Sequence, residues 1–143
     1  MANLLQLAGI ALDATASSQE EAVALCGAKL VELGAVSPEY ADAMWEREKI
    51  FPSEMGEGFA IPHGTDESRK YVNFDQLVFI RLKEEITWVN EPVTVCVGIA
   101  SAGDGHVEIL GNLADVLMDD DAAKILRTSQ DPQAIHDLII KGV

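Results

Sequence analysis

The chain has 143 residues, a hydrophobic fraction of 48% and a formal net charge of −14 at pH 7. This length suits one domain with a core that needs no disulfides or metals, and the hydrophobic fraction excludes a disordered chain. The negative charge argues against nucleic acid or anionic lipid as a direct partner, because either would repel such a surface. No apolar run is long enough for a membrane span, so we expect no direct membrane insertion and a cytoplasmic protein.

The two cysteines, Cys26 and Cys96, both lie among apolar residues. These surroundings favour buried thiols over a disulfide or a metal site. No Cys-x-x-Cys motif or paired His/Cys spacing is present, so the sequence predicts neither a metal nor a cofactor.

The N-terminal part of the chain predicts a strand and then a helix. A short strand is expected around residues 10–12. Ser18 followed by Glu21 is a capping-box pattern, and apolar residues then recur at helical spacing until Gly34. This pattern predicts a helix over residues 19–33.

A second helix is expected over residues 39–49. Ser37 and Pro38 are typical of an N-cap and a first helical position, and the helix is expected to end near Ile50. Its last turn carries Arg47 among other charged residues, whose default environment is solvent.

The second half of the chain predicts strands followed by helices. Residues 77–82 are rich in β-branched and aromatic side chains, and residues 93–100 form a nearly continuous apolar run. Both patterns indicate strands, the second one covered on both faces. Residues 86–88 could add a short strand or edge. Three further helices are expected, beginning at His106, near residue 122 and at Asp131-Pro132.

The order of these elements predicts the fold class. One strand, two helices, several strands and three helices indicate an α/β protein, specifically a three-layer α/β/α sandwich with a mixed central sheet. No internal repeat or linker interrupts the chain, so a single domain is expected over residues 1–143.

The most informative stretch is residues 56–65, Gly-Glu-Gly-Phe-Ala-Ile-Pro-His-Gly-Thr. Pro62 fixes its own φ and favours extended geometry in the residue before it, so the strand end predicted over residues 59–61 delivers His63 to a rigid rim. Glycines on both sides allow sharp turns. A histidine held in this way is positioned for chemistry.

This stretch closely resembles the active-site segment of the mannitol/fructose-type enzyme IIA of the bacterial phosphoenolpyruvate:sugar phosphotransferase system. The resemblance runs nearly end to end and implies a single type 2 enzyme IIA domain over residues 1–143, with the architecture predicted above. It also implies that His63 accepts a phosphoryl group from the carrier protein HPr and passes it to a IIB component. The implied substrate is mannitol, with fructose as the alternative.

The resemblance implies the partners as well. In this family a IIB domain receives the phosphoryl group on a cysteine, and a IIC domain carries the sugar through the membrane. Neither Cys26 nor Cys96 lies in an exposed glycine-rich loop, so IIB and IIC are expected to be separate chains. The acidic charge fits a partner such as HPr with basic residues near its own histidine.

Phosphoryl transfer requires more than the nucleophile. His63 must attack as neutral imidazole with its other nitrogen protonated, and the phosphoryl oxygens need donors or positive charge. Candidates are the backbone amides near Gly64 and the side chains of His106 and Arg47, while Glu57 could orient a histidine. The resemblance marks the same positions: Arg47 in Trp-Glu-Arg-Glu-Lys, Glu57 in the glycine-rich approach, and His106 in Gly-Asp-Gly-His-Val-Glu-Ile-Leu.

Further residues are expected around this centre. Thr65 is a candidate for the phosphate-binding site beside Gly64, although its hydroxyl could equally bond its own backbone in a turn. The surface that meets HPr and IIB should offer apolar residues rimmed by charge. Phe59, Val107 and Ile109 are the candidates for this surface, and each could instead belong to the core.

Three alternatives stay open. A regulatory paralogue of the nitrogen-linked type would keep the chemistry but control other proteins; the Pro-His-Gly-Thr context, His106 and Arg47-Glu48 favour transport. A non-catalytic binding domain of the same fold would not need His63. A metal site built from His63, His106 and Glu57 has no spacing in its favour.

Overall fold

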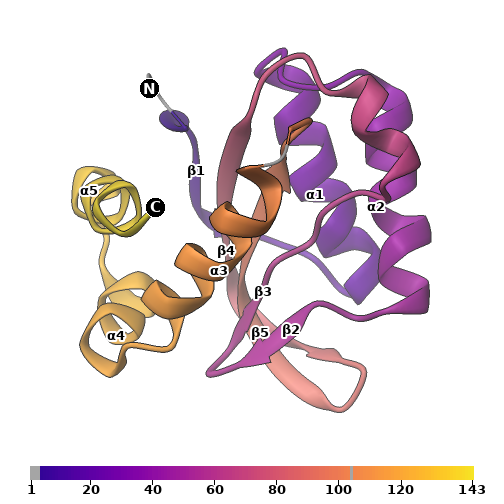
Figure 1. Ribbon diagram of the computed structural model, residues 1–143. Helices are drawn as coiled ribbons and strands as arrows, with labels where there is room; N and C mark the ends of the chain where they lie inside the picture. The colour runs from indigo at the N-terminus through magenta and orange to yellow at the C-terminus, as the bar shows by residue number, and fades with distance from the viewer. Residues whose placement is uncertain (1–3, 104) are drawn as a thin grey trace.

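Across residues 4–103 and 105–143, which the computed structural model describes, a five-stranded sheet lies between two helices on one face and three on the other (Figure 1). Of Gly105 and His106 only the backbone is described. The elements are β1 (Leu5–Ala14), α1 (Gln19–Glu32), α2 (Pro38–Ile50), β2 (Glu54–Gly56), β3 (Phe59–Ala60), the 3₁₀ helix η1 (Glu67–Tyr71), β4 (Gln76–Trp88), β5 (Glu91–Ala100), α3 (Gly105–Leu117), α4 (Asp120–Thr128) and α5 (Pro132–Gly142).

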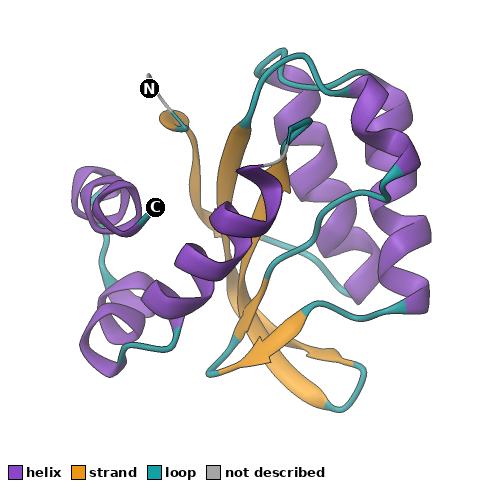
Figure 2. Ribbon diagram, in the orientation of Figure 1, coloured by secondary structure: helices purple, strands orange, loops and turns teal. Residues whose placement is uncertain are grey.

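The sheet has the order β1-β4-β5-β3-β2 and is mixed (Figure 2). β1 runs parallel to β4 and β3 parallel to β5, whereas β4 with β5 and β2 with β3 are antiparallel. The central strand β5 is almost continuously apolar because helices cover both of its faces. The predicted three-layer sandwich with a mixed sheet is confirmed.

Helices α1 and α2 pack on one face of the sheet. The Ser18 hydroxyl accepts a hydrogen bond from the Glu21 amide at 3.2 Å, as the capping box predicts. Gly27 lets the two helices approach closely, since a Cβ atom there would lie 2.7 Å from the Cβ of Ala41. The largest fully buried side chains of this layer are Leu30, Tyr40, Met44 and Trp88.

Helices α3, α4 and α5 cover the opposite face. The carboxylates of Asp119 and Asp131 cap α4 and α5 by accepting backbone N–H bonds at 2.9 and 3.0 Å. Buried side chains of this layer include Phe59, Phe79, Leu113, Leu117, Leu126 and Ile139. All five predicted helices are therefore present, with ends close to those expected.

The strands differ from the predictions in length. β1 is longer than the strand expected at residues 10–12, because parallel pairing with β4 extends it to Leu5–Ala14. Residues 86–88 form no separate strand: they continue β4 after a bulge between Arg81 and Ile86. β2 was not predicted, since three residues carry too little pattern to detect.

Cys26 and Cys96 are both buried free thiols, as expected. A hydrogen bond with Cys26 and burial raise the pKa of the Cys96 thiol. Within the described part of the chain, no helix has the length and apolar character needed to cross a membrane.

Candidate active site

His63 lies just beyond β3, beside β5. It forms an isolated parallel bridge with Ile99, whose amide donates to the Pro62 carbonyl at 3.0 Å. The His63 residue is only 7% exposed. The strand end and the proline thus hold this histidine against the sheet, as the sequence predicts.

The imidazole of His63 has a defined orientation. Its Nδ1 atom lies 2.8 Å from the Ile61 carbonyl oxygen. Because a carbonyl oxygen can only accept, Nδ1 carries the proton and the lone pair of the neutral ring lies on Nε2. The acceptor that fixes the tautomer is therefore a backbone carbonyl two residues earlier.

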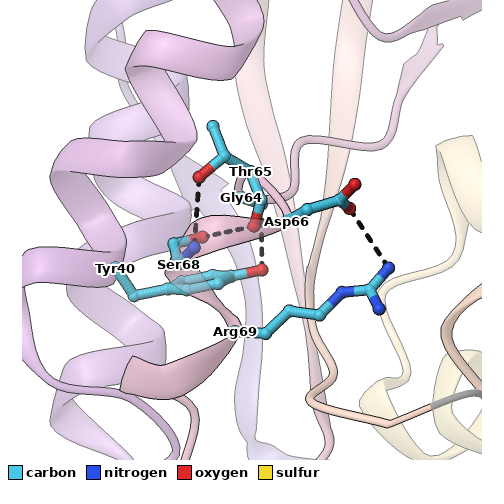
Figure 3. Close-up of polar contacts among 6 residues, drawn as sticks. All are labelled: Tyr40, Gly64, Thr65, Asp66, Ser68 and Arg69. Carbon is cyan, nitrogen blue, oxygen red and sulfur yellow. Dashed lines mark hydrogen bonds and ion pairs between the residues drawn. The ribbon is translucent and has the colours of Figure 1, made fainter.

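Tyr40 supports the segment that follows His63 (Figure 3). Its hydroxyl donates to the Ile99 carbonyl at 2.8 Å and accepts from the Gly64 amide at 2.9 Å. Burial raises the pKa of Tyr40 to about 12, although the Gly64 amide and the charge of Arg69 both favour the phenolate. The neutral hydroxyl therefore joins α2, β5 and the histidine segment.

The Gly64 amide, predicted as a donor to phosphate, donates to Tyr40 in this structure. The glycine is required for packing, because a Cβ atom would lie 2.6 Å from the Tyr40 ring and 2.4 Å from the Ser68 hydroxyl.

Thr65 forms hydrogen bonds within its own turn, which the sequence analysis gave as the alternative to phosphate binding. Its hydroxyl accepts from the Ser68 amide at 3.2 Å, and its carbonyl accepts from the Ser68 hydroxyl at 2.7 Å (Figure 3). These bonds begin the helix η1, which an Asp66–Arg69 ion pair at 3.2 Å also spans. Thr65 nevertheless lines the cleft described next.

A cleft of 560 Å³ opens at His63. Arg47 and Arg69 line it together with Asp66 and Glu67, so both signs of charge are present. Arg47 donates through Nη1 to the Phe51 carbonyl, and its guanidinium carbon lies 5.7 Å from the centroid of the Phe51 ring. The structure thus brings Arg47 into the same cleft as His63, and adds Arg69, which the sequence did not single out.

Apolar side chains form a rim at this cleft. Val107, Ile50 and Phe51 are 73%, 68% and 65% exposed, and all three line the cleft. Val107 was predicted for the partner surface, whereas Ile50 and Phe51 were missed because they follow a charged helix end. We call these three residues the apolar rim.

Two other predicted surface residues lie elsewhere. Phe59 is fully buried in the core beneath α3 to α5, so it is not available to a partner. Ile109 is half-buried and packs against the same core. Phe59 is thus a core residue and Ile109 contacts the core, the alternative that the sequence left open, because apolar residues of a short strand and of a helix face look alike in either environment.

Neither Glu57 nor His106 is among the described residues that line the cleft at His63. Glu57 is an exposed residue with φ of +57° in the turn between β2 and β3, where its carbonyl accepts from Arg127 at 2.9 Å. It does not line the cleft. His106 lies in the first turn of α3, next to Val107, but its side chain lies outside the described residues.

Glu48 is a buried residue behind the rim, which the sequence had marked only as the neighbour of Arg47. It is 1% exposed, and its carboxylate accepts from the Ser53 amide at 2.6 Å, the Ser53 hydroxyl at 2.7 Å and the Trp88 indole at 2.9 Å. Gln19 donates a further bond at 3.3 Å. These bonds anchor the segment after α2, which carries Phe51, to β4.

The chain is similar to known proteins in both sequence and structure. The family described as "Phosphoenolpyruvate-dependent sugar phosphotransferase system, EIIA 2" matches residues 3–142. The mannitol-specific phosphotransferase enzyme IIA component of Staphylococcus aureus (strain Mu50) is 39% identical over 114 residues, which are 80% of this chain and 79% of that protein.

Two further relatives extend the comparison. The mannitol-specific EIICBA component of Vibrio cholerae is 35% identical over 130 residues, 89% of this chain, but the chain spans only 20% of that relative. Among solved structures, the complex of enzyme IIAMTL and phosphorylated enzyme IIBMTL from Escherichia coli aligns with a TM-score of 0.88 at 30% identity, covering 96% of this chain and 97% of that one.

Proposed function

Because the chain belongs to the EIIA 2 family of the phosphoenolpyruvate-dependent sugar phosphotransferase system, we propose that it relays a phosphoryl group on His63 from HPr to a IIB component. The protein is a phosphotransferase. The observation that carries the assignment to His63 is the Nδ1 contact with the Ile61 carbonyl at 2.8 Å, which directs the nucleophilic lone pair to Nε2.

The transfer step follows from this tautomer. The Nε2 lone pair of His63 attacks the phosphorus of phospho-HPr, a new N–P bond forms, and the N–P bond to the donor histidine breaks with its electrons returning to that imidazole. The proton stays on Nδ1 throughout, where it is donated in a hydrogen bond to the Ile61 carbonyl. Arg47 and Arg69, which line the same cleft, supply positive charge near the transferred group.

The other predicted site residues, His106, Thr65 and Glu57, have different roles in this proposal. His106 is proposed as a donor to the phosphoryl oxygens from the start of α3, a position supported by its neighbour Val107 at the cleft. Thr65 lines the cleft but already accepts a hydrogen bond from Ser68. Glu57 lies in a turn bonded to Arg127, so we give it no part in the transfer.

The apolar rim is proposed as the docking surface for both partners. Val107, Ile50 and Phe51 are exposed around a histidine that must be reached in turn by a donor and an acceptor. A relay needs transient contacts, which small interfaces provide. The similarity to a IIA chain solved in complex with phosphorylated IIB supports IIB as one of these partners.

The transported substrate is proposed to be mannitol, on the similarity to the Staphylococcus aureus mannitol-specific enzyme IIA. IIB and IIC components, with a cysteine acceptor on IIB, are proposed as partners in this transfer, in line with the similarity to a IIA chain solved in complex with phosphorylated IIB. A cytoplasmic location is part of the same proposal.

The test is phosphorylation from phosphoenolpyruvate with enzyme I and HPr, followed by intact mass under neutral and acidic conditions. One acid-labile phosphoryl group is expected on wild type and none on His63→Ala. His136→Ala is the matched control, because His136 lies on α5 and contacts Asp137 instead of the cleft. An unphosphorylated wild type, or a phosphorylated His63→Ala, would overturn the proposal.

Onward transfer is measured by adding a mannitol-type IIB component to the phosphorylated protein. Loss of the mass increment from this chain and its gain on IIB is expected. Retention of the phosphoryl group with mannitol- and fructose-type IIB alike would instead support the regulatory alternative.

A further inference from the structure

A second cavity, of 580 Å³, lies where β4 and β5 meet the end of α4. It shares no lining residue with the His63 cleft. We call it the Arg81 groove, after the residue at its base. Its charged and polar lining includes Asp13, Arg81, Lys83, Thr94, Arg127 and Gln130.

Arg81 is a buried charge with unused hydrogen-bond donors. It is 6% exposed, and its Nη2 atom donates to the carbonyls of Leu126 and Ser129. Its Nε and Nη1 atoms are buried and have no hydrogen-bond partner among the residues that the structure describes. Leaving such donors unpaired inside a protein is costly, so an acceptor from outside residues 4–103 and 105–143 would stabilise this guanidinium.

No carboxylate supplies that acceptor within residues 4–103 and 105–143, where Arg81 forms no ion pair. Asp13 is the one acidic residue lining the groove. It acts on Arg81 from a distance: burial lowers the pKa of Arg81, and the charge of Asp13 opposes that shift. The groove is therefore short of negative charge.

The groove also gathers cations in an acidic protein. The chain has 10 lysines and arginines against 24 aspartates and glutamates, yet Arg81, Lys83 and Arg127 all line this cavity. Arg127 is held in place by a hydrogen bond to the Glu57 carbonyl at 2.9 Å and by a Phe59 ring centred 5.8 Å away. Thr94 and Gln130 add polar side chains beside these charges.

We propose that the Arg81 groove binds a small phosphomonoester dianion. Three cations and one carboxylate leave a net charge of about +2, which matches the charge of a phosphomonoester at neutral pH. Phosphate oxygens accept several hydrogen bonds at once, which suits the unpaired Nε and Nη1 donors of Arg81. The volume of 580 Å³ admits a phosphorylated metabolite of several carbons.

The binding test is a titration of the ¹⁵N-labelled protein with glycerol 3-phosphate, inorganic phosphate and citrate, followed by amide chemical shifts. Saturating shifts are expected at Arg81, Thr94 and Arg127 with glycerol 3-phosphate, and weaker ones with inorganic phosphate. Tighter binding of citrate would overturn the assignment to phosphomonoesters. Shifts confined to Gly64 and Thr65 would overturn the site itself.

Variants that each remove one positive charge test which residues of the Arg81 groove contribute to phosphomonoester binding. Lys83→Gln and Arg127→Gln each remove one cation from the groove at residues that are not buried. Each is expected to weaken glycerol 3-phosphate binding by about tenfold, the effect of losing one charge-assisted contact. Lys124→Gln is the matched control: it removes an exposed cation of α4 outside the groove and should leave the affinity unchanged.

Arg81→Met tests the central residue directly. The folded variant is expected to lose the saturating shifts and the rise in melting temperature that the ligand gives wild type. If Arg81→Met does not fold, the two glutamine variants decide the outcome. Equal affinity in wild type, Lys83→Gln and Arg127→Gln would overturn the proposal.

Discussion

Glu48 and Arg81 are both buried charges in the same small domain, and their surroundings are opposite. Glu48 is 1% exposed and receives hydrogen bonds from Gln19, Ser53 and Trp88. Arg81 is 6% exposed, and two of its three guanidinium nitrogens have no partner. The first charge is fully paired inside the protein, whereas the second is paired only in part.

This difference separates a structural residue from a candidate binding residue. A buried charge whose partners all come from the chain holds those partners in place, as Glu48 holds the segment behind the apolar rim. A buried charge with unpaired donors at a cavity is available to a ligand.

Glu48→Ala should lower the free energy of unfolding by about 3–5 kcal/mol, because it leaves four buried donor contacts without their acceptor. Chemical denaturation measures the change. Glu46→Ala is the control, since Glu46 is exposed and pairs with Lys49 at 2.9 Å, and surface pairs contribute about 1 kcal/mol at most. Equal costs for the two variants would contradict the structural role of Glu48.

Tyr40 is a third buried ionisable residue, but it is neutral where Glu48 and Arg81 are charged. Its pKa is raised from 10.0 to about 12 in the folded protein, so between these values the unfolded chain ionises while the folded one keeps its proton. The Tyr40 contribution is therefore complete below pH 10 and is lost as pH rises to about 12, by up to about 3 kcal/mol. The difference in alkaline unfolding between wild type and Tyr40→Phe measures it, and equal pH profiles would contradict it.

Arg81→Met should change the free energy of unfolding by no more than about 1.5 kcal/mol in the absence of ligand. The lost bonds to the Leu126 and Ser129 carbonyls are offset by removal of two unpaired buried donor nitrogens. Chemical denaturation under the same conditions as for Glu48→Ala gives the comparison. A loss as large as that of Glu48→Ala would mean that Arg81 is primarily structural.

Phe51→Ser should leave the free energy of unfolding within about 0.5 kcal/mol of wild type, because Phe51 is 65% exposed. Phosphorylation by phospho-HPr should nevertheless need about tenfold more HPr to reach half its maximal rate, since an aromatic contact of the apolar rim is removed. Phe74→Ser is the control, because Phe74 is 44% exposed and lies outside the cleft. Similar kinetics for both variants would contradict the docking role of the rim.

Local signals were sufficient to predict most of the fold. The capping box at Ser18 and the Ser37-Pro38 pair marked the starts of α1 and α2, because caps depend on neighbouring residues alone. The length of β1 was not predictable in this way: its pairing with β4 depends on residues about seventy positions away. The bulge that joins residues 86–88 to β4 likewise has no local pattern.

The candidate site was predicted in part. His63 and Arg47 could be placed together because sequence motifs mark them, and both line the cleft. Tyr40 could not, since its two hydrogen bonds reach Gly64 and Ile99, 24 and 59 residues away. Its pairing with Gly64 likewise gives a structural partner to an amide that the motif suggested for phosphate binding.

The position of β1 in the sheet has a consequence for synthesis of the protein. β1 is an edge strand of ten residues whose neighbour in the sheet is β4, and Leu5 pairs with Leu77. At about 5–20 residues per second, the ribosome takes about 4–14 s to add the residues between them. A nascent chain therefore carries this largely apolar strand unpaired for several seconds, the interval in which it is most prone to associate with other chains.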